Sequence, residues 1–348
     1  MSGGEGVWRW RFAGDAARRL LGDAPEARFA SARIVKENEF REVLADGECF
    51  CKVERIPGRG FAAEFRRGTA LAAAGIPVVE HLAYGVSPEG RGALVTRAEA
   101  AASAAEYLAE HPKPEPEFCD ALAHFTRRLV ESPFFHADLH LGNLLWHPER
   151  PSFTLVDVRA VSGGLPARFR KLFARRRMLR LPLEIAARLP RAEVLRLLGI
   201  AGAREPESFF RREWRRESFR RLREWPRRRR QILAGYLKFT RREGERLVAS
   251  QWRGDPSELV AVEGGEEWFL AGFLLSLLRI PHVEYPVLEA GRLRRAGSLP
   301  ERLPDAAALT DWRERLALSG FDAPAEAWRA DDDGTPLLAD LTAVADSI

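Results

Sequence analysis

Two aspartates and one asparagine are spaced in this sequence as the transfer of a phosphoryl group requires. Asp138 and Asn143 lie in the string HADLHLGN, residues 136–143, and Asp157 follows at the end of an apolar run. The reaction needs bound phosphates, Mg²⁺ to neutralise them, and a carboxylate at the attacking hydroxyl. Oxygen-bearing side chains suit Mg²⁺. We expect Asp138 to accept the hydroxyl proton, and Asn143 and Asp157 to bind the metal.

A β-hairpin must bring the two parts of this motif together. We expect Leu144–Trp146 to leave the loop as a buried strand, and Phe153–Val156 to return as its partner. We expect His136 to hold the loop by hydrogen bonding rather than to act as a base, and His140 to line the site or cap the loop. The alternative is a loop of turn-forming residues without chemistry, which the completeness of the string disfavours.

The same chemistry needs a cation for the phosphates and an acid that positions it. Lys52 stands near the end of the predicted strand Glu48–Arg55, and Glu64 follows twelve residues later in the predicted helix Phe61–Ala74. A strand lysine followed by a helix glutamate is common by chance, but the downstream loop favours this pair. The competing charges, interpreted as a solvated face, are Glu54, Arg55, Arg66 and Arg67.

Strand and helix patterns divide the chain into a sheet-rich part and a helical part. An Asp-Gly turn at residues 46–47 predicts a hairpin, and Gly75 with Pro77 ends the first helix. Helices are predicted at Ala98–Ala109 and Pro116–Glu131, and basic amphipathic helices in 166–230. The predicted strands are Ser31–Val35, Phe40–Leu44, Glu48–Arg55, Val78–Val86 and Ala93–Thr96.

These residues together resemble the protein-kinase-like superfamily, and within it the lipopolysaccharide core kinases, which include the Kdo kinases and the WaaP-type heptose kinases. The run EFRRGTALAAAGIPV, residues 64–78, resembles the helix of that family and the Ala-Gly-Ile-Pro segment after it. LVDVRAV, residues 155–161, resembles its variant of the metal-binding motif. Arginine-rich helices such as Arg168–Leu198 are typical of its small C-terminal lobe. The resemblance covers about residues 31–240.

The resemblance implies an α+β protein with a bilobal protein-kinase-like fold. Residues 1–96 would form a small N-lobe, an antiparallel sheet with one helix. Residues 97–240 would form a reduced, mainly helical C-lobe that holds the catalytic loop and the basic helices. Residues 241–348 would be a C-terminal extension.

By the same resemblance, ATP would be the phosphate donor, Mg²⁺ the cofactor, and a sugar hydroxyl of the lipid A-core the acceptor. The catalytic residues would be Asp138, Asn143 and Lys52, with Asn143 and Asp157 as metal ligands.

The nucleotide would also be held by residues of the predicted N-lobe. Lys52 would contact the α- and β-phosphates and pair with Glu64. A hinge at residues 94–97, with Leu94 and Thr96, would contact adenine through backbone groups.

Three departures separate the chain from protein kinases. Residues 36–48 hold a single glycine, Gly47, so no glycine-rich loop covers the phosphates. Asp157 is followed by Val-Arg rather than Phe-Gly. The segment SGGLP, residues 162–166, leaves no room for a long activation loop. The last two argue against a regulated protein kinase.

Charge is distributed unevenly along the chain, although the net charge is only +5. Residues 168–180 hold seven Lys or Arg and no acid, and residues 204–230 hold twelve Arg and five Glu. The last fifty residues hold eleven acids and four Arg. Such a basic middle suits an anionic partner, a glycolipid or the anionic surface of a membrane. The alternative is an arginine-rich decoration of solvated helices.

Composition describes a soluble globular protein, with 46% hydrophobic and 30% charged residues. The longest apolar run, Phe269–Leu278, is about half of what a membrane span needs and predicts a buried helix. No secretory signal is visible at the start. Cys49, Cys51 and Cys119 lack metal-site spacing, which favours a reducing compartment. We expect a cytoplasmic protein. Peripheral binding to the inner face of the inner membrane is compatible with this expectation.

Two further functions remain open on the sequence. An aminoglycoside- or choline-kinase-like phosphotransferase shares the His-x-Asp loop, but such enzymes tend towards an acidic acceptor pocket. A pseudokinase scaffold would not need the five polar residues of the motif, all of which are present. Nucleic acid is not expected as a partner, because the arginine runs lack a recognised fold motif.

Two short strings near the end of the chain echo strings of the kinase-like part. IPHVE, residues 280–284, resembles IPVVE, residues 76–80, and LADLTAV, residues 338–344, resembles LVDVRAV. The segment Phe239–Trp252 could likewise mimic Phe40–Glu54. Chance similarity of strand fragments is the favoured account, and the alternative is a degenerate kinase-like repeat, with Gln251 near the position of Lys52.

Overall fold

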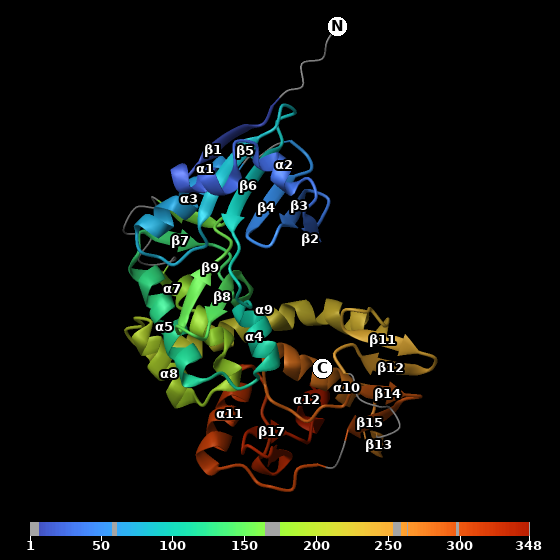
Figure 1. Ribbon diagram of the computed structural model, residues 1–348. Coiled ribbons are helices and arrows are strands. Elements are labelled where there is room, and N and C mark those ends of the chain that lie inside the picture. Colours follow the sequence, from blue (N-terminus) through green and yellow to red (C-terminus); the bar gives the residue numbers. More distant parts are fainter. Residues whose placement is uncertain are drawn as a thin grey trace. The chain divides into compact units, whose positions relative to one another are not determined.

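The computed structural model describes residues 7–57, 61–163, 175–252, 259–262, 264–296 and 299–347 (Figure 1). It is an α+β protein with several antiparallel sheets. The chain divides into two compact units: unit 1 comprises residues 1–188 and 196–204, and unit 2 comprises 189–195 and 205–348. The predicted boundary at 96/97 falls inside unit 1, and that at 240/241 falls inside unit 2. Part of the predicted basic segment, residues 164–174, lies outside the described residues.

Unit 1 begins with a six-stranded antiparallel sheet in the order β1-β5-β6-β4-β3-β2. The predicted hairpin turn is present: Gly47 has φ of 99°, and Asp46 Oδ1 accepts hydrogen bonds from the N–H groups of Glu48 and Cys49. The sequence patterns did not predict β1 or the two short helices after it. The strands are β1 (Arg9–Phe12), β2 (Arg33–Glu37), β3 (Arg41–Ala45), β4 (Cys49–Glu54), β5 (His81–Val86) and β6 (Gly92–Arg97).

The two faces of this sheet have different partners. Helices α1 (Asp15–Leu21) and α2 (Pro25–Phe29) cover one face, where the thiols of Cys49 and Cys51 are buried in an apolar cluster. Side chains alternate between faces along a strand. Lys52 therefore points to the opposite face.

Helix α3 (Ala62–Ala73) packs on that opposite face, over β5. Gly68 permits the approach, because a Cβ there would lie only 2.3 Å from the His81 ring. The rings of Phe65 and Tyr84 add a contact at 5.1 Å between centroids. Gly75, with φ of 75°, ends the helix as predicted.

The rest of unit 1 is mainly helical around a small aromatic core. Phe118, Trp146 and Phe153 are buried and in mutual ring contact. They hold the predicted hairpin, β8 and β9, against helix α5. The elements are α4 (Ala104–Glu110), α5 (Pro116–Glu131), β7 (Phe134–His136), η1 (Leu141–Asn143), β8 (Leu144–His147), β9 (Ser152–Leu155), β10 (Val161–Gly163), α7 (Arg175–Met178), η3 (Leu181–Glu184), η4 (Ala186–Arg188) and the second half of α8 (Arg191–Ile200). Residues 191–195 of α8 belong to unit 2.

Unit 2 contains a five-stranded antiparallel sheet in the order β11-β12-β14-β15-β13, and the long helix α9 (Pro206–Leu233). The predicted buried helix is α10 (Glu266–Leu278). Among the described residues, no helix is long and apolar enough to cross a membrane. The other elements are β11 (Thr240–Glu243), β12 (Arg246–Ala249), β13 (Leu259–Val262), β14 (Val287–Glu289), β15 (Arg292–Ala296), α11 (Ala306–Leu318), η6 (Ala325–Ala327), β16 (Trp328–Ala330), β17 (Pro336–Leu338) and α12 (Thr342–Ala345).

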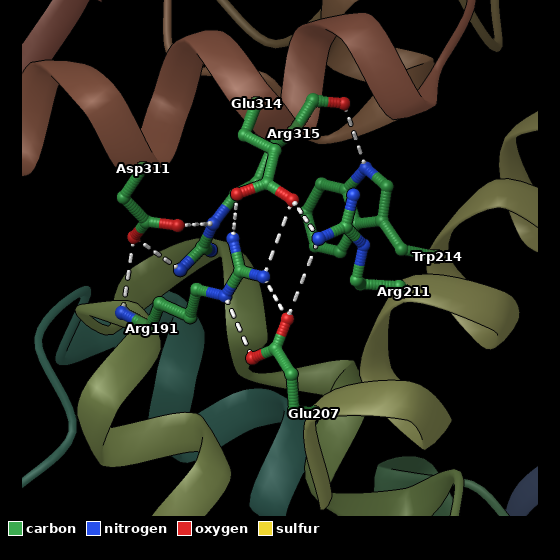
Figure 2. Close-up of polar contacts among 7 residues, drawn as sticks. All are labelled: Arg191, Glu207, Arg211, Trp214, Asp311, Glu314 and Arg315. Carbon is green, nitrogen blue, oxygen red and sulfur yellow. Dashed lines mark hydrogen bonds and ion pairs between the residues drawn. The ribbon is translucent and has the colours of Figure 1, made fainter.

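An ion-pair network ties three helical segments of unit 2 together (Figure 2). Arg191 bonds to Glu207 on α9 and to Glu314 on α11. Arg315, whose side chain is fully buried, donates to Asp311 at 2.7 Å and packs over the Trp312 ring. A buried guanidinium requires such partners. Arg191 and Arg315 therefore have a structural role in unit 2.

Candidate active site

Lys52 and Glu64 form a buried ion pair in unit 1. Lys52 Nζ lies 2.6 Å from Glu64 Oε1, and the side chains of Lys52 and Glu64 are 16% and 4% exposed. Strand β4 lies between β6 and β3 in the sheet. Helix α3 packs on the face of the sheet to which the Lys52 side chain points. The packing of this helix on the sheet thus brings the two residues of the predicted pair together.

The β8–β9 hairpin is joined by backbone hydrogen bonds to the segment just after α3. Val79 N–H donates to the carbonyl of Leu155, and Leu155 N–H donates to the carbonyl of Pro77, both at 3.0 Å. Two residues beyond Leu155, the hairpin ends at Asp157. The N–H between them, on Val156, donates to the Asn143 carbonyl at 3.0 Å. Asp157 is therefore held beside the Asn143 loop and near the α3 connection.

His136 bonds to the backbone of both aspartates. Its Nε2 lies 2.6 Å from the carbonyl oxygen of Asp157, and its Nδ1 lies 3.2 Å from the Asp138 N–H nitrogen, which donates. A neutral ring with its proton on Nε2 satisfies both contacts. Burial lowers the pKa of His136, although the nearby carboxylates and the Asp157 carbonyl oppose this. This arrangement suits the holding role expected for the residue.

Asn143 is oriented by a hydrogen bond within its own loop. Its Nδ2 donates to the backbone carbonyl of Asp138 at 2.9 Å, which leaves Oδ1 as the acceptor that a metal could use. His140 caps η1 by accepting from the Gly142 N–H, and its Nε2 lies 4.0 Å from Asp138 Oδ2. The Asp138 side chain is 74% exposed, so a substrate hydroxyl can reach it.

The environment of Asp157 keeps its carboxylate ionised. Burial alone would raise its pKa, but the charge of Lys52, the Arg159 N–H that bonds to Oδ1, and the charge of Arg41 outweigh burial, so that the pKa lies below its usual value. An ionised carboxylate is what a metal ligand requires. Charges on β3 and β4 and a backbone N–H just after Asp157 therefore act together to lower the pKa of this residue.

Arg41 is a site residue that the sequence patterns did not single out. It begins β3, and two residues later Val43 pairs with Lys52 across the β3–β4 ladder, so Arg41 and Lys52 share a face. Its Nη1 is buried and has no hydrogen-bond partner. A buried, unsatisfied charged donor is costly. The one available sequence signal was its position in the hairpin where a glycine-rich loop is missing.

A cleft of about 550 Å³ opens at the β3–β4 turn, where Arg28 of α2 also borders it. Ala45 and Phe50, which pair across the ladder, line it together with Ala32 and Ala98. Both strand residues are two positions from the Val43–Lys52 pair. The cleft therefore lies on the opposite side of Lys52 from Arg41 along the strands.

Leu94 and Thr96 lie inside β6, which is paired with β4 and β5 on its two sides. Leu94 pairs with Lys52 and Thr96 with Phe50, and both side chains are buried. Because the sheet occupies their backbone groups, contact with adenine through the backbone would have to come from residues after β6, such as Ala98. The role of Leu94 and Thr96 in nucleotide binding stays a prediction.

The residues present fit a magnesium site that is completed by phosphates. Among the described residues, no group of three or more His, Cys, Asp or Glu could hold a metal. Mg²⁺, however, usually binds one or two carboxylates together with substrate phosphates and water. Asp157 and Asn143 offer one carboxylate and one amide oxygen.

Comparison of the sequence with protein families and with curated proteins gives no match. Two solved structures of WbdD, one of them a co-crystal with a kinase inhibitor, show a distant similarity. Their identities are 18% and 17%, and their TM-scores 0.31 and 0.32. The matches cover 47% and 48% of this chain and 44% of each WbdD chain, so less than half of either chain is involved. Likeness this slight does not establish an activity.

Proposed function

We propose that this protein is an ATP- and Mg²⁺-dependent phosphotransferase, and that unit 1 is its kinase-like catalytic unit with a bilobal arrangement. The surroundings of Asp157 are the main support for the proposal. Lys52 on a central strand pairs with Glu64 on a helix, and the charge of Lys52 lowers the pKa of Asp157, which lies far away in the sequence at the end of a hairpin. Protein kinases use a strand lysine, a helix glutamate and a metal-binding aspartate in this way.

The site divides the work of nucleotide binding among neighbouring groups. The cleft at Ala45, Phe50 and Ala98 takes the base, and Lys52 and Arg41 lie beyond it along the strands for the phosphates. Arg41 takes over part of the role of the missing glycine-rich loop. Mg²⁺, when bound, neutralises charge on the phosphates.

Asp138 performs the proton transfer. The acceptor hydroxyl attacks the γ-phosphorus, a new P–O bond forms, and the bond from the γ-phosphorus to the β–γ bridging oxygen breaks. ADP leaves with that electron pair, and the hydroxyl proton passes to the Asp138 carboxylate. The exposed side chain of Asp138 supports this role. Its backbone is held on both sides, because its N–H donates to His136 Nδ1 and its carbonyl accepts from Asn143 Nδ2.

We propose a sugar hydroxyl of lipopolysaccharide core, Kdo or heptose, or of a related anionic glycolipid, as the acceptor. On α9, Glu217 and Glu224 neutralise several arginines. Arg216, Arg223 and Arg227 are exposed and pair with no described carboxylate. They favour an anionic partner, and peripheral contact with an anionic membrane would use the same charge.

An acceptor panel tests the proposal. The protein is incubated with γ-labelled ATP and Mg²⁺, and separately with core oligosaccharides, cationic aminoglycosides, choline or a protein substrate. Label on core oligosaccharide is the expected result. Label on the cationic compounds alone would favour the aminoglycoside- or choline-kinase-like alternative. No transfer to any acceptor, with no ATP-dependent thermal shift, would favour a pseudokinase scaffold.

Two aspartate variants separate the proposed roles. Asp138→Ala should abolish transfer and keep nucleotide binding, because the residue acts on the hydroxyl. Asp157→Ala should also weaken Mg²⁺-dependent nucleotide binding. The matched control is Asp23→Ala, whose side chain is 81% exposed, and it should retain both. Full activity in Asp138→Ala would refute its assignment as the base.

A further inference from the structure

A backbone contact of the catalytic hairpin in unit 1 recurs in unit 2. Val283 N–H donates to the Leu338 carbonyl, and Leu338 N–H donates to the Pro281 carbonyl, both at 3.0 Å. The Val79 and Leu155 amides make the same two bonds in unit 1. In each unit the isolated parallel bridge links a strand of a hairpin with an Ile-Pro segment that follows a helix.

The recurrence extends through the loop before the hairpin. A three-residue 3₁₀-helix, η1 or η6, leads directly into the first strand in both units. Ala339 N–H donates to the Ala327 carbonyl at 2.8 Å, as Val156 N–H donates to the Asn143 carbonyl at 3.0 Å. Both units therefore share the 3₁₀-helix, the hairpin and the hydrogen bond at its return, although β16 and β17 are each one residue shorter than β8 and β9.

The residue after this return is an aspartate in each case. Asp340 Oδ1 accepts the N–H of Thr342 at 2.9 Å, and Asp157 Oδ1 accepts the N–H of Arg159 at 3.0 Å. Counted back from the 3₁₀-helices, Asp322 corresponds to Asp138. Their side chains are 80% and 74% exposed.

The elements upstream follow the same order. Unit 1 runs β2, β3, β4, α3, β5, β6, and unit 2 runs β11, β12, β13, α10, β14, β15. In both, the first strand pairs with the second, the third with the fifth, and the fourth with the fifth. One pairing differs, because β3 pairs with β4 whereas β12 pairs with β14.

The helix before the Ile-Pro segment also ends alike. Ile280 N–H donates to the Leu275 carbonyl at 3.0 Å, and Ile76 N–H to the Leu71 carbonyl at 3.1 Å. Twelve residues before each isoleucine lies the position of Glu64, which in unit 2 is Trp268.

Three of the positions that would serve the nucleotide carry other residue types in the second scaffold. Lys52 pairs with a leucine of β6, and the residue in the matching place on β13 is Val262, which pairs with a leucine of β15. By strand pairing Val262 therefore corresponds to Lys52, and not Gln251 as the sequence echo indicated. Asn143 corresponds to Ala327. Of the five polar positions, only the two aspartates remain in unit 2. Asp322 is already paired with Arg313 at 3.8 Å, and no lysine stands at the position of Lys52 to hold phosphate near Asp340.

We propose that unit 2 is a degenerate copy of the catalytic scaffold of unit 1, and that it binds no Mg²⁺-nucleotide. Each chain then has a single phosphotransfer site. This inference rests on the function proposed for unit 1. The chance account of the two sequence echoes does not explain why their backbone hydrogen bonds coincide.

Binding stoichiometry tests the statement about nucleotide. Titration of the full chain with Mg²⁺ and a non-hydrolysable ATP analogue should give one site. Asp340→Ala should leave that site unchanged, and the matched Asp157→Ala should weaken it at least tenfold. Two sites, or loss of binding in Asp340→Ala, would overturn the proposal. No binding in any variant would sink the function proposed for unit 1, while unit 2 would remain without nucleotide as proposed.

Amide hydrogen exchange tests the shared scaffold without any nucleotide. The amides of Val283, Leu338 and Ala339 should exchange at least tenfold more slowly than those of an unstructured peptide, as should their counterparts Val79, Leu155 and Val156. Rapid exchange confined to the unit 2 amides would show that the second scaffold does not form, and would overturn the proposal.

Discussion

The ring of His136 joins the two aspartates of the candidate site: its Nε2 lies 2.6 Å from the Asp157 carbonyl, and its Nδ1 accepts the Asp138 N–H. Both bonds depend on a neutral imidazole with one donor and one acceptor. Protonation would place a second proton on Nδ1, against the N–H of Asp138. The geometry of the loop is thereby coupled to pH.

Acid should destabilise unit 1. Burial lowers the pKa of His136 and of His81, so the unfolded chain takes up protons below about pH 6.5 that the folded unit does not. The stability from these groups is present above the unfolded pKa and is lost as pH falls below it. We expect a loss of up to about 1.4 kcal/mol per histidine and pH unit. Thermal melts at pH 7.5, 6.5 and 5.5 measure it.

Histidine variants test whether His136 is responsible for the predicted loss of stability at low pH. His136→Asn removes one titrating ring, so its melting temperature should vary less with pH than that of the wild type, even though it is lower at pH 7.5. His124→Asn, at an exposed position on α5, should keep the wild-type dependence. Equal pH dependence in all three proteins would contradict the assignment to His136.

The Lys52–Glu64 pair should contribute separately to stability and to activity. Lys52→Met leaves the Glu64 carboxylate, 4% exposed, without its cation, and removing one partner of a buried pair costs about 3–5 kcal/mol. The double variant Lys52→Met, Glu64→Leu removes both charges and should recover most of that stability but no phosphotransfer. Urea unfolding and label transfer measure the two effects. Activity in the double variant would show that Lys52 does not act on the phosphates.

Arg41 should discriminate between nucleotide and nucleoside. Hydrogen bonds to charged groups contribute about 1.5–3 kcal/mol, so Arg41→Ala should weaken Mg²⁺-ATP binding by roughly ten- to a hundredfold. Adenosine, which lacks phosphates, should bind as it does to the wild type. Calorimetry with both ligands measures the difference. Arg11→Ala, at an exposed position on the distant strand β1, should change neither affinity. Equal losses for ATP and adenosine would contradict a phosphate contact.

The sequence was sufficient to predict those parts of the site that are defined by spacing. The Asp-Gly turn predicts the β3–β4 hairpin, and the spacing of Lys52 and Glu64 suits a strand followed by a helix. Arg41 could not be singled out in the same way. Tertiary packing decides that the Nη1 atom of Arg41 is buried without a hydrogen-bond partner. Local sequence patterns carry no information on tertiary packing.

The scaffold of unit 2 illustrates the same limit. Its backbone bonds match those around Leu155 and Val79, but backbone geometry is compatible with many sequences. The residues that identify a catalytic loop are those that do chemistry, and Asn143 has only Ala327 as its counterpart. With that signal lost, the sequence retained two short echoes that chance could explain.

Unit 2 should depend strongly on a single buried ion pair. Asp311 accepts hydrogen bonds from Arg315, whose side chain has no exposed surface, and from the Arg191 N–H. Burial lowers the pKa of Arg315, and the Asp311 carboxylate opposes that shift and keeps the guanidinium charged. Asp311→Ala removes this partner, and we expect a loss of about 3–5 kcal/mol, measured by urea unfolding followed by tryptophan fluorescence.

A variant on the same helix provides the graded control for that prediction. Asp305 caps the N-terminus of α11 by accepting from the Ala307 and Ala308 N–H groups, and losing such a cap costs about 1 kcal/mol. Asp305→Ala should therefore destabilise unit 2 much less than Asp311→Ala. If both variants lost about 1 kcal/mol, the Arg315 charge would have to be compensated by its hydrogen bond to the Leu189 carbonyl and its aromatic contacts with Phe210, Trp214 and Trp312. The order of the two losses therefore decides whether the Asp311 carboxylate or these other contacts stabilise the buried guanidinium.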